Sequence, residues 1–406
     1  MIFSNLLLAS VAAAGIVHMP LTVRNTNDEA QALSRRGVGH GTTSWDGYFY
    51  EATVEIGTPS QNVTARVDTG SGHFWVPGAN STTCEKKQCK EGVTFNISES
   101  STWQFRELGA NWGGHGLNGR ETFAYAGETV EDFTVYVSTD NMQNEMPIFG
   151  QAPIKNSSLS FVQALADTKK ISRAVYSLVS DGPITTWNRD HDPKQWKQIK
   201  TDVYYGGYDK AKYEGPLVTF DRTDYSTYFI PLSGFSVDGE PVKGHEHEVY
   251  FDTGGITLTL PNATVAAVST KHGGEYNDEH KVWTIKCDAK PVVGFGFGYI
   301  SIPVDMDQFI KPVQGIDNLC GLQGFNIAPD TQKTMYNGPH IISKAFIIND
   351  NDRQQTHIAL AKYTDESDVV EITGDIPGTV LYKDWLAGKP LPGQSGAPHT
   401  TLAVAH

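Results

Sequence analysis

The stretch RVDTGSGHFWVPG, Arg66–Gly78, decides the fold because its Asp-Thr-Gly occurs a second time in the chain. The second copy lies in YFDTGGITLTLPN, Tyr250–Asn262. An apolar, strand-like run leads into each Asp, and a Pro preceded by an apolar residue follows nine positions later. One copy alone would be a weak signal, since Asp and Gly are common in turns. Two copies about 180 residues apart predict two similar lobes that place Asp68 opposite Asp252.

Paired carboxylates have a specific chemistry. Two carboxylates held close together cannot both ionise easily, so the pair keeps one proton over a wide acidic range. The ionised Asp can take a proton from a bridging water, while the protonated Asp donates one to a substrate carbonyl. This scheme predicts a hydrolase that requires no cofactor, no metal ion and no covalent intermediate.

The residues around both copies favour an all-β fold. The period of two that is typical of half-buried strands recurs in three segments: 50–56, 62–68 and 130–138. Helical patterns are few, at 158–171 and 262–274. In the second helix, Asn262 is a candidate N-cap and Gly273 a candidate residue just past the C-terminus. The 40 Gly and 20 Pro residues oppose long helices.

The N-terminal residues have the features of a targeting segment. An apolar stretch followed by Ala12-Ala13-Ala14 leads us to interpret residues 1–14 as a signal peptide, with a buried strand or helix as the alternative. The polar segment 15–36 ends in Arg35-Arg36 and is interpreted as a short propeptide, although two ordinary surface arginines would give the same pattern. The expected remainder is an N-terminal lobe, 37–208, a C-terminal lobe, 209–385, and a flexible tail, 386–406.

A secreted, extracellular protein is expected to pair its cysteines. Sequence proximity suggests Cys84–Cys89 and Cys287–Cys320, although four cysteines allow three connectivities. Five sequons for N-glycosylation agree with secretion: Asn62, Asn80, Asn96, Asn156 and Asn262. The net charge of −14 argues against a nucleic-acid partner. No segment is long enough for a membrane anchor, and a monomer is expected.

These motifs and several others resemble the pepsin-like aspartic proteases, in particular fungal secreted members and yapsins. The additional segments are YEATVEIGTPSQNVTA, PIFGQAP, YYGGYDKAKYEGPL, AFIINDNDRQQTHIALAKY and both cysteine spacings. The resemblance implies two six-stranded-type β-lobes with a cleft for an extended peptide. It implies that Asp68 and Asp252 are catalytic, that Ser71 supports Asp68 and that Trp75 lies behind the flap. The other supporting residues implied are Thr69, Gly70, Thr253 and Gly254.

Three departures from the family pattern lie near the expected active centre. The hydroxyl residue that usually follows the second Asp-Thr-Gly is replaced by Gly255, followed by Ile256. Such a lost bond to a carboxylate is worth about 1.5–3 kcal/mol. In the hairpin Asn111–Gly127, the flap Tyr aligns with Trp112, beside Gly113, or with Tyr125 in a shifted alignment. The third departure is the apolar-apolar-Gly of the second lobe, which aligns with Ile341-Ile342-Ser343.

These departures leave two functional hypotheses open. The first is an active acid endopeptidase, with candidate pocket walls that could equally be core: Phe74, Trp112, Phe123 and Ile256. The second is a weakened or inactive homologue that binds a protein or carbohydrate in its cleft. A metal site at His245–Glu248 is disfavoured because no third ligand is evident. A serine hydrolase is disfavoured because GQSG in the tail lacks the spacing of a nucleophile elbow.

Overall fold

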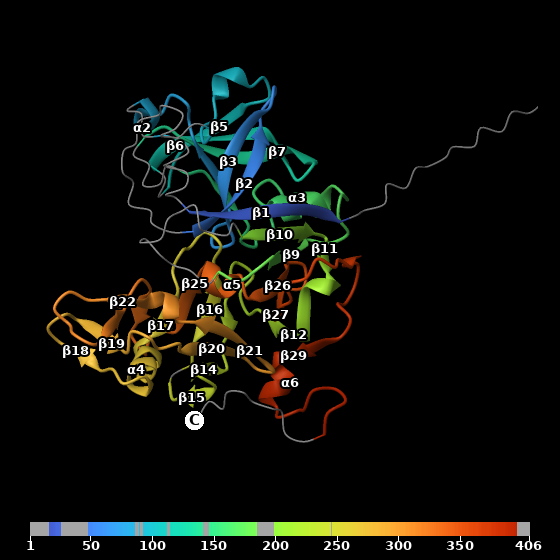
Figure 1. Ribbon diagram of the computed structural model, residues 1–406. Coiled ribbons are helices and arrows are strands. Elements are labelled where there is room, and N and C mark those ends of the chain that lie inside the picture. The colour runs from blue at the N-terminus through green and yellow to red at the C-terminus, as the bar shows by residue number, and fades with distance from the viewer. Residues whose placement is uncertain are drawn as a thin grey trace, which may run out of the picture.

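The computed structural model describes residues 16–25, 48–85, 89, 92–111, 114–140, 146–184, 199–244 and 246–395. Over these residues the chain is built mainly of strands. Figure 1 shows an N-terminal lobe, coloured blue to green, above a C-terminal lobe in yellow and orange, with strands of both halves running between them. The expected all-β, two-lobed fold is confirmed.

One long sheet passes through the N-terminal lobe and into the C-terminal half of the chain. Its strands, in spatial order, are β29 (Thr379–Leu381), β12 (Tyr213–Asp221), β27 (Gln355–Ala361), β26 (Ala345–Asp350), β9 (Val175–Ser180), β10 (Lys200–Tyr205), β1 (Val17–Asn25), β2 (Tyr48–Ile56), β3 (Gln61–Asp68), β8 (Ile148–Gly150), β4 (Phe74–Pro77), β7 (Glu128–Ser138), β6 (Gly114–Tyr125) and β5 (Gln104–Asn111). The middle of this sheet joins the two halves, because β26 pairs with β9.

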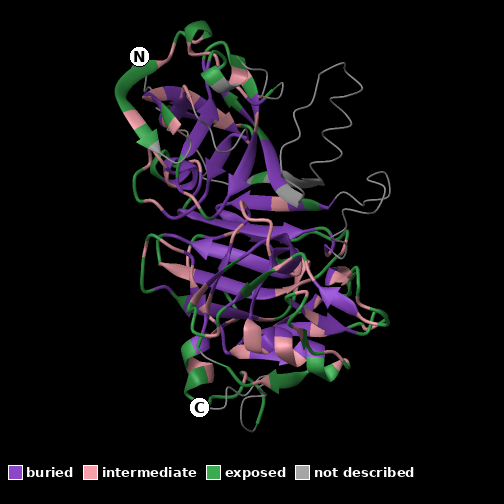
Figure 2. Ribbon diagram, turned by 90° about the vertical axis from the view of Figure 1, so that its left-hand side faces the viewer, coloured by how far each residue is buried: buried purple, intermediate pink, exposed green. Residues whose placement is uncertain are grey.

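Smaller sheets complete the C-terminal lobe. They are β13 (Ile230–Pro231) with β16 (Glu248–Phe251) and β25 (Thr334–Asn337); β15 (Glu240–Val242) with β14 (Gly234–Val237), β20 (Val292–Phe297) and β21 (Ile300–Asp305); β17 (Thr259–Pro261) with β24 (Asn326–Ala328); β18 (Tyr276–Asn277) with β19 (Val282–Ile285), β23 (Cys320–Leu322) and β22 (Ile310–Pro312); and β11 (Gly207–Asp209) with β28 (Val369–Glu371). Figure 2 shows that the strands of both lobes are mostly buried. Among the residues described, no helix has the length and apolar composition to cross a membrane.

The α-helices described are short: α2 (Thr82–Glu85), α3 (Phe161–Asp167), α4 (Asn262–Lys271), α5 (Pro339–Ile342) and α6 (Tyr382–Leu386). The two expected helices are confirmed as α3 and α4, and Gly273 has the left-handed φ of +75° expected just past a helix end. The N-cap prediction for Asn262 is wrong. Pro261 holds that position, and the Asn262 side-chain oxygen instead accepts a hydrogen bond from Trp283 Nε1 at 3.0 Å.

Strand β1 comes from the segment interpreted as a propeptide. It lies between β10 and β2, with Val17 opposite Tyr205 and Thr22 opposite Glu51. Cleavage after Arg36 would therefore remove the strand that joins β2 to β10. Arg35-Arg36 and the residues of the predicted signal peptide lie outside the described part of the chain, so both divisions stay predictions.

Two charged residues break the expected alternation of buried and exposed positions. Thr53 and Glu55 are exposed on β2, as their period predicts, but Glu51 is only 4% exposed. On β3, Arg66 is likewise 4% exposed. The two residues lie opposite each other in the β2–β3 pair. The period of two therefore fails at the end of these strands that leads to Asp68.

The strand register corrects the predicted counterpart of Ile148-Phe149-Gly150. In the first lobe, β3 runs parallel to β8 and places Gly150 beside Asp68. In the second lobe, β16 runs parallel to β25 and pairs Phe251 with Asn337, so Gly338 lies next to Asp252. A Cβ atom on Gly338 would lie 2.5 Å from the backbone oxygen of Gly255.

The counterpart is therefore Tyr336-Asn337-Gly338, and the alignment with Ile341-Ile342-Ser343 is wrong. Ser343 lies just after α5 and is fully buried. Its hydroxyl accepts a hydrogen bond from the Ile184 N–H at 3.0 Å. The serine thus satisfies a buried donor and does not crowd Asp252.

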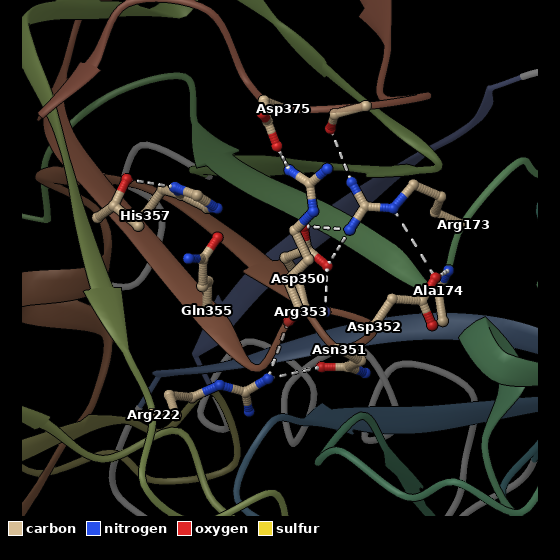
Figure 3. A network of polar contacts seen from close by, with 12 residues as sticks. Arg173, Ala174, Arg222, Asp350, Asn351, Asp352, Arg353, Gln355, His357 and Asp375 are labelled. Carbon is tan, nitrogen blue, oxygen red and sulfur yellow. Dashed lines mark hydrogen bonds and ion pairs between the residues drawn. The ribbon is translucent and has the colours of Figure 1, made fainter. Parts of the chain in front are cut away.

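A buried polar network fastens the β26–β27 hairpin to its neighbours (Figure 3). Asp350 is fully buried and accepts hydrogen bonds at 2.6 Å on both carboxylate oxygens from Arg173 Nη2. Arg222 donates to the Asp350 carbonyl at 3.1 Å. Because a buried carboxylate is costly without such partners, this network ties the connection before β9 to the C-terminal half.

The expected disulfides, Cys84–Cys89 and Cys287–Cys320, are both present. The second links the residues that follow β19 to the start of β23, two strands that already pair at Ile285 and Cys320. The disulfide therefore reinforces an existing sheet contact in the C-terminal lobe.

The register correction predicts that Gly338→Ala and Ser343→Gly each lower the free energy of unfolding by about 1–3 kcal/mol. The first adds a methyl group against backbone, and the second leaves the Ile184 N–H without its acceptor. Urea titrations of the three proteins measure the effect. A Ser343→Gly variant more stable than the original would restore the sequence alignment and contradict the register.

Candidate active site

The two Asp-Thr-Gly copies meet between the lobes and hold each other through crossed hydrogen bonds. Asp68 ends β3, and Asp252 directly follows β16. The Thr69 N–H donates to Thr253 Oγ1 at 2.9 Å, and the Thr253 N–H donates to Thr69 Oγ1 at 3.0 Å. Each hydroxyl then donates to a carbonyl of the opposite lobe, Phe251 at 2.6 Å and Val67 at 2.7 Å.

The same crossing brings each glycine against the opposite carboxylate. A Cβ atom on Gly70 would lie 2.7 Å from Asp252 Oδ1, and one on Gly254 would lie 2.3 Å from Asp68 Oδ1. Only glycine allows this approach. Asp68 and Asp252 therefore face each other, as the duplicated motif predicts.

The environment favours a proton on this pair. Burial raises the pKa of Asp252 to about 7, with further increases from the charge of Asp68 and a hydrogen bond to it. The N–H groups of Gly254 and Gly255 oppose this increase. Because two close carboxylates resist double ionisation, the pair can hold one acid and one base at once.

The two carboxylates have unequal support. Asp68 accepts from the Gly70 N–H at 2.7 Å and from the Ser71 hydroxyl at 2.6 Å, which places Ser71 where the resemblance implied. Asp252 accepts from the Gly254 N–H at 2.9 Å. At Gly255 no hydroxyl is possible, and a Cβ atom there would lie 2.9 Å from Asp252 Oδ2.

The residues two positions before each Asp were not predicted as part of the site. Arg66 Nη1 donates to the Gly254 carbonyl at 3.2 Å, and the Tyr250 hydroxyl donates to the Thr69 carbonyl. Besides its threonine, each lobe thus sends a further side chain to the opposite Asp-Thr-Gly. The duplication could have directed attention to these positions, but neither residue type is by itself a signal.

The expected flap is a hairpin of β5 and β6, with Asn111 paired to Gly114. Trp112 and Gly113 lie outside the described residues, so the flap assignment stays a prediction. The alternative flap residue, Tyr125, is wrong. It is buried at the far end of β6 and packs edge-on against Phe149 and Phe161.

Trp75 is buried next to Tyr136 and Ile148. The Tyr136 hydroxyl donates to the Gly114 carbonyl at 2.6 Å and to the Gly109 carbonyl at 3.3 Å. This tyrosine supports both arms of the β5–β6 hairpin near its tip, a role that the sequence did not indicate.

Two candidate pocket residues are core residues. Phe74 and Phe123 are buried and contact each other edge-on, with ring centroids 5.0 Å apart. Ile256 is only partly buried and packs against Val93 and Met146. Trp112 is outside the described residues.

An aromatic group beside Asp252 was also missed. Tyr336 is 49% exposed, stacks on Tyr250 with centroids 5.3 Å apart and meets Phe229 edge-on at 5.2 Å. It occupies the position of Ile148 in the other lobe, because both lie two residues before the paired glycine.

One histidine of the disfavoured metal site, His247, contacts the backbone. His247 is buried, and its Nδ1 lies 2.9 Å from the Gln332 carbonyl oxygen. His245 lies outside the described residues. In the described part of the chain, no group of three or more His, Cys, Asp or Glu side chains is arranged to hold a metal ion.

Comparison with known proteins agrees with this geometry. The family model described as "Eukaryotic aspartyl protease" matches residues 49–362. The chain belongs to this family. Aspartic proteinase yapsin-3 of Saccharomyces cerevisiae is 25% identical over 90% of this chain and 76% of its own length. Barrierpepsin of the same species is 24% identical over 82% of this chain and 64% of its own length. Pepsin II-2/3 of Oryctolagus cuniculus is 25% identical over 79% of this chain and 84% of its own length.

The sequons of this aspartyl protease family member differ in accessibility. Asn62, Asn80 and Asn156 are exposed, whereas Asn96 and Asn262 are partly buried. The side-chain oxygen of Asn96 also caps a short 3₁₀ helix by accepting from the Ser98 N–H. Glycosylation stays a prediction at all five sites, with the three exposed asparagines best placed to carry a glycan.

The raised pKa of Asp252 predicts a pH-dependent stability. Between about pH 4 and pH 7, the folded protein keeps a proton on Asp252 that the unfolded chain releases, so stability falls as pH rises. Relative to Asp252→Asn, the free energy of unfolding of the original protein should fall by on the order of 2–4 kcal/mol across this window. Urea titrations at each pH measure the difference.

The matched control is Asp132→Asn, which changes an aspartate whose side chain is 66% exposed. This variant should reproduce the pH dependence of the original protein. If Asp252→Asn also leaves that dependence unchanged, Asp252 does not hold the proton.

Proposed function

We propose that this protein is a secreted aspartic endopeptidase that cleaves peptide bonds with a water activated between Asp68 and Asp252. The observation that carries the proposal is the pair itself: two carboxylates face each other across the lobes, and burial together with Asp68 raises the pKa of Asp252. Membership of the aspartyl protease family supports the same conclusion.

Each carboxylate has a role in the proposed mechanism. The ionised member takes a proton from the water, whose oxygen attacks the carbonyl carbon of the peptide bond. The protonated member donates to the carbonyl oxygen. Collapse of the resulting tetrahedral intermediate then breaks the C–N bond: the nitrogen receives the proton that the first carboxylate took from the water, and the other carboxylate takes back its proton from the hydroxyl group. Ser71 and the N–H groups of Gly70 and Gly254 orient the carboxylates throughout.

The substrate is proposed to be a protein or peptide in an extended conformation. The β5–β6 hairpin would cover it, with Trp112 in place of the usual flap tyrosine. An indole offers one N–H donor, whereas a tyrosine hydroxyl can donate and accept. We therefore propose that the flap covers the substrate through contact area and a single donor.

Activity is tested with acid-unfolded haemoglobin and casein between pH 2 and 6. We expect cleavage by the processed protein, inhibition by pepstatin and a loss of at least about 1000-fold for Asp68→Asn and Asp252→Asn, since both halves of the acid–base chemistry fail. Asp132→Asn should keep full activity. The absence of cleavage by correctly processed protein across this pH range would reject the proposal.

A weakened or inactive binding homologue is the second candidate, and Gly255 favours it. Asp252 lacks the hydroxyl donor that Ser71 gives Asp68. This alternative would be supported if the protein cleaves neither substrate but still binds pepstatin, as measured by calorimetry.

Secretion is proposed from the signal-like residues 1–14, the sequons and the two disulfides. N-terminal sequencing of protein from the culture medium of expressing cells tests it. A start at Gly15 or Gly37 is expected for the signal-cleaved and propeptide-cleaved forms. Retention in the cell with Met1 intact would contradict both predicted cleavages.

A further inference from the structure

A buried cation lies on the same strand face as the catalytic pair. Arg66 precedes Asp68 by two residues on β3, and side chains two apart in a strand point to one face. It is 4% exposed, and arginine is almost never buried to this extent without paired charge. Glu51 lies opposite it on β2 and is equally buried. A positive and a negative side chain therefore sit beneath the pair.

Contacts with the second lobe fix the position of this cation. Arg66 Nη1 donates to the Gly254 carbonyl at 3.2 Å, within the motif that carries Asp252. Tyr250 makes the corresponding contact in reverse, to the Thr69 carbonyl. The guanidinium thus crosses the lobe boundary at the place where the two carboxylates meet.

The guanidinium stays charged in this position. Burial lowers the pKa of Arg66, while the charges of Asp68, Asp252 and Glu51, in that order, raise it. The ordinary arginine pKa is so high that the group remains protonated in folded proteins. Both members of the pair and Glu51 therefore favour the charged form of Arg66.

We propose that Arg66 is a positioning residue of the aspartate pair: it ties the Gly254 carbonyl to the first lobe and sets a permanent positive charge beside both carboxylates, with Glu51 as its counter-charge. This inference rests on the proposed function. It assigns a role to a residue whose side chain is not among the expected catalytic and supporting groups.

The cation offsets the weaker support of Asp252. Ser71 has no equivalent at Gly255, so the ionised form of Asp252 lacks one donor. A nearby positive charge favours an ionised carboxylate over a protonated one. Arg66 supplies from the first lobe part of the stabilisation that a hydroxyl at position 255 would give.

The other titratable groups around the pair are neutral in acid or already named. From β16 and β25, Tyr250 and Tyr336 face Asp252, and burial raises the pKa of both tyrosines. β8, which pairs with β3, contributes Ile148-Phe149-Gly150 and no titratable group. Among the described residues of these strands, Arg66 is therefore the cation beside the pair, and Glu51 is the acidic group opposite it.

The test is the pH profile of kcat/KM for three variants. Arg66→Met removes the cation, so both limbs of the bell-shaped profile should move to higher pH by about one pH unit or more. Glu51→Gln leaves the cation without its counter-charge, so both limbs should move to lower pH. Arg66→Lys keeps the charge and should stay close to the original profile.

Two further variants separate this role from a general loss of stability. Glu51→Gln combined with Arg66→Met leaves no unpaired buried charge and should fold, with its profile still displaced upward because the variant lacks the cation that contacts the motif carrying Asp252. Arg222→Met removes a cation of similar burial, 6% exposed, that belongs to the Asp350 network. It should lower stability without moving the profile.

A folded Arg66→Met protein with the original profile, or an equal displacement in Arg222→Met, would overturn the proposal. If the original protein has no activity, the proposed function is rejected but the role of Arg66 is not. Measurements of stability against pH then test the role of Arg66. The difference in free energy of unfolding between the original protein and Asp252→Asn is measured against pH, and its midpoint reports the titration of Asp252. This midpoint should lie about one pH unit higher when both proteins also carry Arg66→Met. An unchanged pH would overturn it independently.

Discussion

The electrostatic repulsion between two buried carboxylates is the constraint on which the rest of the site depends. Two unit charges 4 Å apart repel by about 4 kcal/mol at the effective dielectric constant typical of protein sites. The crossed hydrogen bonds of Thr69 and Thr253 hold the two loops together against this repulsion. A proton shared by the pair would remove most of this cost, and in the proposed mechanism it would also provide the acid and the base for hydrolysis.

The two lobes support their carboxylates with different groups. Asp68 has a hydroxyl donor in Ser71, whereas Asp252 has backbone donors and a glycine at the corresponding place. The first lobe also contributes a cation at the position where the second lobe has Tyr250. A duplicated frame thus carries unequal groups around its two carboxylates.

Much of the fold and the centre of the site could be predicted from the sequence. The duplicated Asp-Thr-Gly and the strand period are local patterns, and they predicted both aspartates and the all-β class, while the family resemblance implied the role of Ser71. Register is not local: the true counterpart of Gly150 is Gly338, which only the pairing of β16 with β25 reveals. The buried pair Glu51–Arg66 was missed for the same reason. Each residue alone fits the polar side of a strand, and only their cross-strand pairing beneath the active centre explains their burial.

The most direct test of the account is the titration of the two carboxyl groups themselves. In protein labelled with ¹³C-carboxyl aspartate, the resonances of Asp68 and Asp252 can be assigned from Asp68→Asn and Asp252→Asn and followed by NMR across the acidic range. The account predicts two well-separated steps, with one proton held by the pair at about pH 5. Independent titration of both groups near the ordinary aspartate pKa of about 4 would contradict it.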